Sequence, residues 1–327
     1  MTQVTVVGAG VMGCAAAWAL TERGTDVTLI EQFELEHARG SSHGRTRIVR
    51  SAYPEAEWVR LAEEAMDGWR ELEEQSGLTL LGLYGLVEVA PAPELTSADA
   101  LDACGAGYEL LDAAGAARLG VAIPDGWSAL RQADAGVVRA DLARRAFLDV
   151  AVSRGARVET GRRIESTDDV GADVVVVTAG AWVRELVPDV PVSVTRETIA
   201  YFRREGAPTP SVVELDPDTR GHAMYALHDP VHGLKAGAHH AGAEADPGED
   251  GAPDPALVVR IAAWAAERLP DADPEPVGAE SCLYTSTADE SFVLERRGRV
   301  VVGSACSGHG FKFAPAVGRR LAALALD

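Results

Sequence analysis

Three glycines near the N-terminus have the type and spacing of a turn that binds a dinucleotide. They stand in the segment GAGVMG, residues 8–13, and match the pattern G-x-G-x-x-G. A β-branched run precedes this segment and an alanine-rich stretch of good helix formers follows it, which is the context that the motif requires. We expect Gly8 to permit the turn, Gly10 to let the backbone approach a pyrophosphate, and Gly13 to let the helix pack closely on the strand. The alternative is a tight turn that packs by small residues alone.

A carboxylate at the end of the next apolar segment extends this prediction. Glu31 closes the segment 26–31, which is predicted to form a second strand. Its side chain can accept hydrogen bonds from a ribose diol and would repel a 2′-phosphate. Glu31 therefore favours FAD or NAD over NADP, and the motif alone does not distinguish FAD from NAD.

The glycine turn and Glu31 belong to a predicted βαβ unit. Residues 3–7 and 26–31 are predicted strands, and residues 14–23 are a predicted helix between them. Such a unit has parallel strands and a right-handed crossover. The parallel sheet is expected to resume later in the chain, with strands over 157–160, 173–177 and 299–303 and a closing helix over 316–325.

The middle of the chain indicates elements of other kinds. Residues 55–77 predict an amphipathic helix, because their apolar side chains recur on one helical face. Residues 78–89 predict a hairpin-like pair of strands around the segment 82–85. Further predicted elements are a helix over 141–155, strands of a second, antiparallel sheet within 191–204 and 221–240, and an acidic linker over 244–255.

Composition and charge exclude several classes of protein. The 327 residues are 47% hydrophobic and 24% charged, as in ordinary globular chains. Lysine and arginine number 30 against 50 acidic residues, so the net charge of −20 would repel nucleic acid. The four cysteines lack C-x-x-C spacing, so no metal site is predicted and a reducing cytoplasm is expected. We expect no membrane span, because no apolar run reaches the required length of about 18 to 20 residues.

Five short patches occur along the rest of the chain. They are GSSHGRTRIVR at 40–50, TAGAW at 178–182, GLK at 233–235, CLYT at 282–285 and SGHGFKF at 307–313. In type and order they resemble the monomeric sarcosine oxidase family, flavoenzymes of the D-amino-acid-oxidase-like superfamily. The resemblance implies a monomer with covalent FAD that oxidises a secondary-amine amino acid, such as sarcosine or another N-methyl amino acid, to an imine. Reoxidation by O2 would give H2O2.

Resemblance and element pattern together predict an α/β protein with two domains. One is a Rossmann-type FAD-binding domain, and the other is a substrate-binding domain with a mostly antiparallel sheet. The FAD-binding domain is expected to comprise residues 1–77, 140–190 and 275–327. The substrate-binding domain is expected to comprise residues 78–139 and 191–274.

The substrate side of the site is assigned by the resemblance. Arg50 and Lys312 match positions that hold the substrate carboxylate, with arginine as a two-pronged donor and lysine as a point charge. Tyr284, in the CLYT patch, is assigned to substrate binding as well. Arg45 stands where the family often has an acidic residue, which leaves the local charge balance open.

The resemblance also assigns catalytic residues. Lys235 matches the lysine that promotes the reaction with O2, a step in which a cation stabilises developing negative charge. Arg47 is expected near the flavin face, the alternative being a loop cation bound to backbone carbonyls. Tyr225 and His239 are expected in the same pocket, with His232 and His240 as competitors for the role of His239.

On the cofactor side, Cys282 matches the cysteine that bonds the 8α-methyl carbon of the flavin, and Cys306 is a second thiol that could lie close to the ring. His309 is expected to approach the pyrimidine side of the ring. The complete predicted set of cofactor-binding residues is Gly8, Gly10, Gly13, Glu31, Ser41, Ser42, His43, Thr46, Ala179, Gly180, Cys282, Gly308, His309, Gly310 and Lys312.

Three other functions stay open from the sequence. An oxidase or dehydrogenase on the same scaffold could use a cyclic amino acid, resembling pipecolate or proline, in specialised biosynthesis. A nicotinamide-dependent oxidoreductase would explain the N-terminal turn but not the patches at 282–285 and 307–313. A flavin-binding protein without catalysis is the third.

Overall fold

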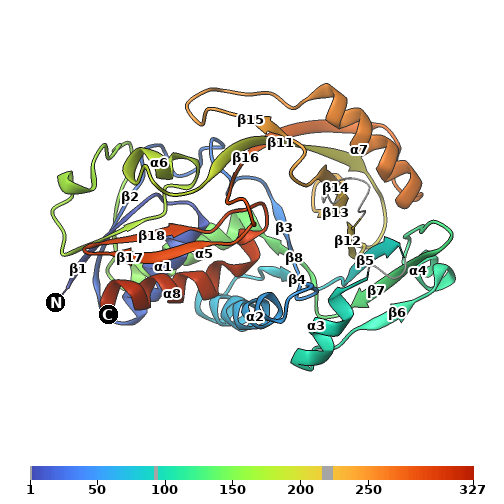
Figure 1. Ribbon diagram of the computed structural model, residues 1–327, viewed down its shortest axis with the longest axis horizontal. Coiled ribbons are helices and arrows are strands. Elements are labelled where there is room, and N and C mark those ends of the chain that lie inside the picture. Colours follow the sequence, from blue (N-terminus) through green and yellow to red (C-terminus); the bar gives the residue numbers. More distant parts are fainter. Residues whose placement is uncertain (1, 92–94, 216–223) are drawn as a thin grey trace.

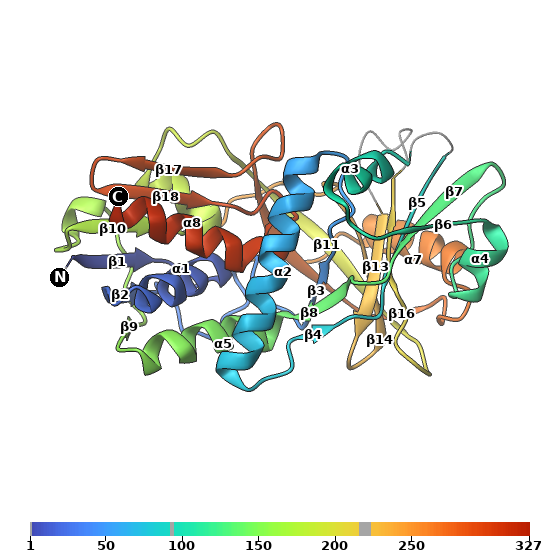
Figure 2. The same cartoon turned by 90° about the horizontal axis from the view of Figure 1, so that it is seen from below.

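The computed structural model describes residues 2–91, 95–215 and 224–327. Two regions lie side by side along the long axis of the molecule, each built on a large sheet (Figures 1 and 2). Both termini lie at the end formed by the six-stranded sheet (Figure 1). The α/β fold class with parallel and antiparallel sheets is thereby confirmed.

The six-stranded sheet contains the predicted βαβ unit. Strand β1 (Gln3–Val7) leads through helix α1 (Val11–Glu22) to strand β2 (Asp26–Ile30), which pairs parallel to β1. The order is β17-β18-β10-β1-β2-β9, and only the edge strand β17 is antiparallel. The other strands are β9 (Arg157–Glu159), β10 (Val174–Val177), β17 (Val293–Arg297) and β18 (Val300–Ser304). The carboxyl ends of β1, β2 and β10 therefore meet at one edge.

Helices bury one face of this sheet (Figure 2). Helix α1 packs between α5 (Ala140–Ser153) and α8 (Ala314–Leu326), and its small alanines allow close approach on both sides. Helix α2 (Ala56–Ser76) crosses this layer and turns its apolar face inward, as its periodicity predicts. The left-handed Gly77 ends α2. Part of the core is aromatic, because Trp18 packs on Phe147 with ring centroids 5.4 Å apart.

The second region is a nine-stranded, mostly antiparallel sheet, as expected. Its order is β15-β11-β14-β13-β12-β5-β7-β6, β16 pairs with β11, and only β5 and β12 run parallel. The strands are β5 (Leu86–Pro91), β6 (Glu109–Leu111), β7 (Trp127–Gln132), β11 (Ser193–Arg203), β12 (Ser211–Glu214), β13 (Met224–Asp229), β14 (Gly233–Ala238), β15 (Ala243–Glu244) and β16 (Pro276–Ser286). Residues 221–223 of the predicted strand range lie outside the described residues. Helix α7 (Pro255–Arg268) packs on β11, β13 and β14.

The predicted hairpin over 78–89 is wrong. Both strands exist, but β4 (Leu81–Gly82) pairs with β8 (Gly136–Arg139) in a three-stranded sheet with β3 (Thr46–Val49), whereas β5 pairs with β7 and β12. The chain turns from one sheet to the other at Gly85, whose φ is +91° and whose N–H donates to Ala135 O at 2.8 Å. A glycine-rich turn between two short strands thus separates two sheets.

One strand connects the two regions. Strand β16 pairs with β11 from Ser193–Ser286 to Phe202–Pro276, so it belongs to the nine-stranded sheet. Its residues fall within the range 275–327 that the sequence assigns to the FAD-binding domain. The domain limits stay a prediction, and β16 is the element that crosses them.

Three short helices complete the described elements of the fold: α3 (Ser97–Cys104), α4 (Ala113–Arg118) and α6 (Val183–Leu186). No described helix is both long and apolar enough to cross a bilayer.

Candidate active site

A cavity of about 710 Å³ runs between the two sheets and gathers almost every predicted site residue. Cavities of roughly 300–1,000 Å³ hold cofactors and other small ligands in proteins. Gly13 is the one predicted residue that does not line it. The lining members of the predicted set are Gly8, Gly10, Glu31, Ser41, Ser42, His43, Thr46, Arg47, Arg50, Ala179, Gly180, Tyr225, Lys235, His239, Cys282, Tyr284, Gly308, His309, Gly310 and Lys312.

The glycine turn at one end of the cavity has the shape of a phosphate-binding turn. Gly8 has φ +102°, and a Cβ there would lie 2.5 Å from Thr178 O. A Cβ on Gly13 would lie 1.8 Å from Gly8 O, so this glycine permits the close packing of α1 on β1. Gly10 meets only the Ser42 hydroxyl, at 3.2 Å from an added Cβ. The Val11 N–H donates to Ser42 Oγ at 3.0 Å, which places Ser42 at the start of α1.

Alanine substitutions at these glycines are expected to separate folding from cofactor binding. Gly13→Ala should destabilise the fold by about 1–3 kcal/mol or more, because the methyl group meets immobile backbone. Gly10→Ala should keep its thermal stability but lose flavin, because the methyl group occupies the space in front of the helix N-terminus. Thermal unfolding and flavin content per chain measure both effects. Gly13→Ala that melts like the parent, or Gly10→Ala with full flavin content, would contradict these assignments.

Glu31 is buried beside the turn and is held by backbone donors. Its Oε2 accepts from Ala9 N–H at 2.8 Å and its Oε1 from Phe33 N–H at 3.0 Å. His37 Nε2 lies 3.7 Å from Oε1. Each carboxylate oxygen has a further lone pair, so the group can still accept from a ribose hydroxyl. The glycine turn, Glu31 and the long cavity therefore fit an adenine dinucleotide.

Lys235 and Arg47 are two neighbouring cations that line the cavity. Lys235 lies on β14, is only 3% exposed, and donates to Thr46 O at 3.3 Å. Burial, together with the charge of Arg47, lowers the pKa of Lys235 to about 7. Arg47 donates to the carbonyl oxygens of Thr46, Ser41 and His43 at 2.9, 2.9 and 2.6 Å. It is therefore a loop cation bound to backbone that also lines the cavity.

Cys282 is close to these two cations. Burial raises the pKa of the Cys282 thiol, and the charges of Arg47 and Lys235 act in the opposite direction. Cys306 also lines the cavity and contributes to the electrostatic environment of Cys282, so the structure brings both candidate thiols together. Tyr225 and Tyr284 lie in the same wall and are hydrogen-bonded to each other.

The two cations expected to bind the substrate carboxylate as a clamp, Arg50 and Lys312, differ in whether they already have an acidic partner. Arg50 Nη1 lies 3.2 Å from Glu88 Oε2, also donates to Ala52 O, and stacks over Tyr53 at 4.2 Å. The Glu88 side chain is fully buried, so the Arg50 charge already has a partner. Glu88 is not among the predicted site residues, although a carboxylate in the middle of the apolar segment LVEVAP is an unusual feature.

Lys312 is the other cation of that clamp. It is 7% exposed, and its Nζ donates to Tyr53 OH at 2.8 Å and His309 O at 2.7 Å. Within the described part of the chain it forms no ion pair with a carboxylate. Burial, followed by the charge of Arg50, lowers the pKa of Lys312 well below its ordinary value. A carboxylate bound here would restore the charged form.

Aromatic residues that the sequence analysis missed surround His309. Its Nδ1 lies 3.1 Å from Tyr53 OH and its Nε2 donates to Glu290 O at 3.0 Å. The Trp58 ring lies 4.9 Å away. Burial lowers the pKa of His309 to about 3, so the ring is neutral. The neighbouring glycines meet protein atoms: a Cβ on Gly308 would lie 2.3 Å from His239 Cε1, and one on Gly310 1.7 Å from Ala305 O.

The remaining predicted residues fall into place around the cavity. Ser41 Oγ donates to Leu283 O at 2.5 Å, and His43 Nδ1 donates to Gly40 O at 2.7 Å. Of the three candidate histidines only His239 lines the cavity; His240 and His232 do not. Arg45 lies outside the lining and pairs with Asp229 at 2.8 Å, which balances its charge.

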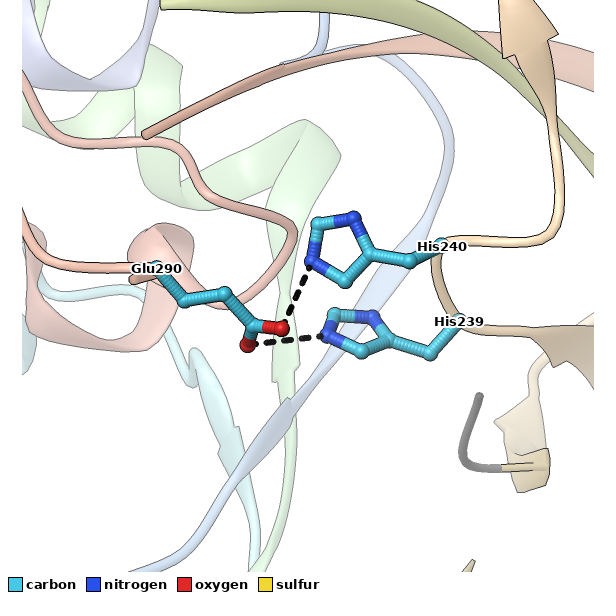
Figure 3. Close-up of side chains that lie close together, drawn as sticks. All are labelled: His239, His240 and Glu290. Atoms are coloured by element: carbon cyan, nitrogen blue, oxygen red, sulfur yellow. Dashed lines mark ion pairs between the residues drawn. The ribbon is translucent and has the colours of Figure 1, made fainter. Parts of the chain in front are cut away.

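The side chains of His239, His240 and Glu290 point toward one another (Figure 3). His239 and Glu290 also line the cavity. Burial lowers the pKa of His239. Burial also opposes charge on His240, but its interaction with the nearby Glu290 carboxylate prevails and raises its pKa. Interactions with the imidazoles of His239 and His240 lower the pKa of Glu290.

The chain resembles known proteins over nearly its full length. The family described as "FAD dependent oxidoreductase" matches residues 3–324. Human peroxisomal sarcosine oxidase is 32% identical over 359 residues, covering 98% of this chain and 91% of that protein. Monomeric sarcosine oxidase of Bacillus sp. (strain B-0618) is 30% identical, covering 99% and 92%. Among solved structures, NikD, an unusual amino acid oxidase essential for nikkomycin biosynthesis, superposes with a TM-score of 0.87 at 25% identity, covering 100% of this chain and 95% of that one.

Proposed function

The chain belongs to the FAD-dependent oxidoreductase family, and from this premise we propose that it oxidises a secondary-amine amino acid, sarcosine or another N-methyl amino acid, to an imine. O2 is the electron acceptor and is reduced to H2O2. The single observation that supports this reading most is the cavity, whose lining includes the glycine turn, Cys282, Cys306 and the buried lysines Lys235 and Lys312. The sarcosine oxidases that resemble the chain over nearly its full length point to the same substrate class.

Different residues along the cavity are proposed to bind different parts of the cofactor and the substrate. The glycine turn, Ser42 and Glu31 would hold the nucleotide end of the cofactor, and Cys282 would attach its ring end covalently. When bound, the flavin accepts the electrons of the amine and passes them to O2. Tyr225, Tyr284 and His239 line the wall beside Cys282 and Lys235 and exclude water from the reacting groups.

Lys312 is proposed as the principal anchor of the substrate carboxylate. It is a buried ammonium without an acidic partner in the described part of the chain, and an anionic ligand satisfies it. Arg50 is tied to Glu88, so it contributes less as long as that pair persists. Neutral His309 and Tyr53 keep the ammonium in place through Nζ contacts to Tyr53 OH and His309 O.

Removal of the Lys312 charge is expected to weaken substrate binding selectively. Hydrogen bonds to a charged group contribute about 1.5–3 kcal/mol, so Lys312→Met should raise KM about 10-fold to 100-fold. Arg45→Met is the matched control, because Arg45 is a cation paired with Asp229 outside the cavity lining. Steady-state kinetics with an N-methyl amino acid measure both. An unchanged KM in Lys312→Met, or an equal rise of KM in Arg45→Met, would refute the proposal that Lys312 binds the substrate carboxylate.

An oxidase or dehydrogenase of a cyclic amino acid is the second candidate. The superposition on NikD supports keeping this candidate, because the same scaffold there belongs to an unusual amino acid oxidase essential for nikkomycin biosynthesis. The two readings differ in substrate and not in the cofactor site.

A screen for H2O2 release over N-methyl and cyclic amino acids tests both. Peroxide released with N-methyl amino acids and not with cyclic ones supports the first reading, and the reverse supports the second. Reduction of the flavin without peroxide would instead indicate a dehydrogenase. Inactivity with every amino acid would contradict both.

We further propose that the protein acts as a cytoplasmic monomer. The described residues contain four free cysteines, Cys14, Cys104, Cys282 and Cys306, and no disulfide, which suits a reducing compartment. The printed name of the Bacillus relative describes that protein as monomeric.

A further inference from the structure

Two imidazoles and one carboxylate lie close together at the cavity. The proposed reaction has no step that requires all three of them. His239 and His240 follow β14, and Glu290 lies on the loop between β16 and β17. His239 Nε2 is 3.8 Å from Glu290 Oε2, and His240 Nε2 is 3.4 Å from Oε1 (Figure 3). The three ligand-type atoms lie within 4.8 Å of one another.

These separations match those between ligands of a tetrahedral metal ion. Zinc–nitrogen and zinc–oxygen bonds of about 2.0–2.1 Å place neighbouring ligand atoms roughly 3.3 Å apart. The two nitrogen–oxygen distances, each to a different oxygen of Glu290, are near this value, and small side-chain rotations would bring both nitrogens and the carboxylate around one ion. We propose that His239, His240 and Glu290 form a binding site for a divalent cation of the zinc type.

The backbone supplies a second, independent observation. His240 has φ +53° and Glu290 has φ +60°, so two of the three residues adopt the left-handed region that side chains disfavour. Such strain persists where the surroundings fix a particular side-chain direction, and it clusters at binding sites. In addition, His240 Nε2 is buried, and its 3.4 Å contact with Glu290 Oε1 is longer than an ordinary N–H···O hydrogen bond. A metal ion would satisfy that nitrogen.

The donor set selects the class of ion. Imidazole nitrogen suits zinc and its transition-metal neighbours, whereas magnesium and calcium prefer sites made of oxygen alone. Three protein ligands leave a fourth position open, as in zinc sites that bind water or another small ligand. His239 and Glu290 both line the cavity, so the open position can face it. The Glu290 side chain is 50% exposed, which gives the ion a path from solvent.

Occupation of this site would alter the cavity. The ion would fix the His239 ring, which lies 5.5 Å from the Tyr284 ring and against Gly308, and would add positive charge to the wall that contains Lys312. We therefore expect zinc to slow amine oxidation, and this expectation rests on the proposed oxidase function. Binding of the ion itself does not depend on that function.

Equilibrium dialysis of the purified holoenzyme against micromolar Zn²⁺, followed by elemental analysis, tests the site directly. The expected result is one zinc per chain. Loss of one protein ligand should weaken binding by at least about 100-fold, since loss of even a supporting residue outside the ligand shell costs about 10–100-fold. His240→Ala and Glu290→Gln should therefore show this loss. His228→Ala, which removes a half-buried histidine bonded to Gly233 O, should bind like the parent.

Two further measurements keep the test independent of folding and of turnover. Circular dichroism of each variant without metal establishes that it is folded. Co²⁺ added to the parent should give the intense visible bands of a tetrahedral complex at wavelengths beyond the flavin absorption, and His240→Ala should not. No zinc bound by the parent, or equal binding by the parent and both ligand variants, would overturn the proposal. A chain that binds zinc but oxidises no amine would refute the proposed function alone.

Discussion

Cys282→Ala is expected to convert a flavin that stays with acid-precipitated protein into one that dissolves in the supernatant. Cys282 is a buried thiol on the cavity wall, and the charges of Arg47 and Lys235 favour its thiolate against the effect of burial. The effect should be complete, because removal of the only bonding sulfur leaves noncovalent contacts that acid destroys. Absorbance of pellet and supernatant after acid precipitation measures it.

Cys306→Ala is the matched control for this experiment. Cys306 also lines the cavity and contributes to the electrostatic environment of Cys282, but it lies outside the CLYT patch. The flavin of the Cys306→Ala variant should stay in the pellet. If Cys306→Ala releases the flavin and Cys282→Ala does not, the attachment assignment moves to Cys306; yellow supernatant from the unmodified protein would mean that the flavin is not covalent at all.

The second large effect is expected from Lys235→Met, which should slow flavin reoxidation by O2 by about 100-fold or more. Lys235 is a nearly fully buried ammonium beside Arg47, and a cation in a water-poor site stabilises negative charge that develops on oxygen. Anaerobic reduction by substrate should change far less. Stopped-flow absorbance of the two half-reactions separates them.

Lys235→Arg keeps the charge and should restore part of the oxygen reaction, whereas a merely structural role would not distinguish these variants in this way. The covalent flavin fraction of each variant must be measured beside the rates, because Lys235 also affects the Cys282 thiol. Equal losses in both half-reactions of Lys235→Met would remove the assignment.

The pKa of Lys235 adds a dependence on pH. Burial and Arg47 lower it to about 7, so the charged form is present below that pH and is lost as pH rises through it. The rate of reoxidation should accordingly fall above neutrality, and a negatively charged group bound beside the ammonium moves the midpoint upward. Lys235→Met should lack this step in a pH profile of the oxygen half-reaction. A step of the same size in that variant would assign the ionisation to another group.

The N-terminal part of the fold was predictable because its determinants are local. The segment 3–31 carries strand, turn, helix and strand in one stretch of sequence, and the turn needs glycine at positions where any side chain would meet backbone. The amphipathic helix α2 was predictable for the same reason, since its apolar face repeats at helical spacing. Convergence of the five patches on one cavity followed from family resemblance, and no local pattern indicates it.

Contacts between residues far apart in the sequence, both ion pairs and strand pairing, could not be predicted from the sequence. Arg50 follows β3, and its partner Glu88 lies on β5 in another sheet, so the charge balance of the expected clamp could not be predicted from the sequence. The strands β4 and β5 carry a hairpin pattern, but their pairing partners lie elsewhere in the chain. The cluster of His239, His240 and Glu290 joins segments far apart in sequence, and the absence of C-x-x-C spacing gave no reason to expect it.

The most direct test is the visible spectrum of the purified chain during anaerobic addition of N-methyl amino acids, followed by admission of O2. A flavin enzyme that oxidises such amines should show yellow absorbance that bleaches with substrate and returns with O2, with one H2O2 formed for each flavin reoxidised. A chain that stays colourless after incubation with excess FAD, or a yellow chain whose spectrum no amino acid changes, would contradict the account.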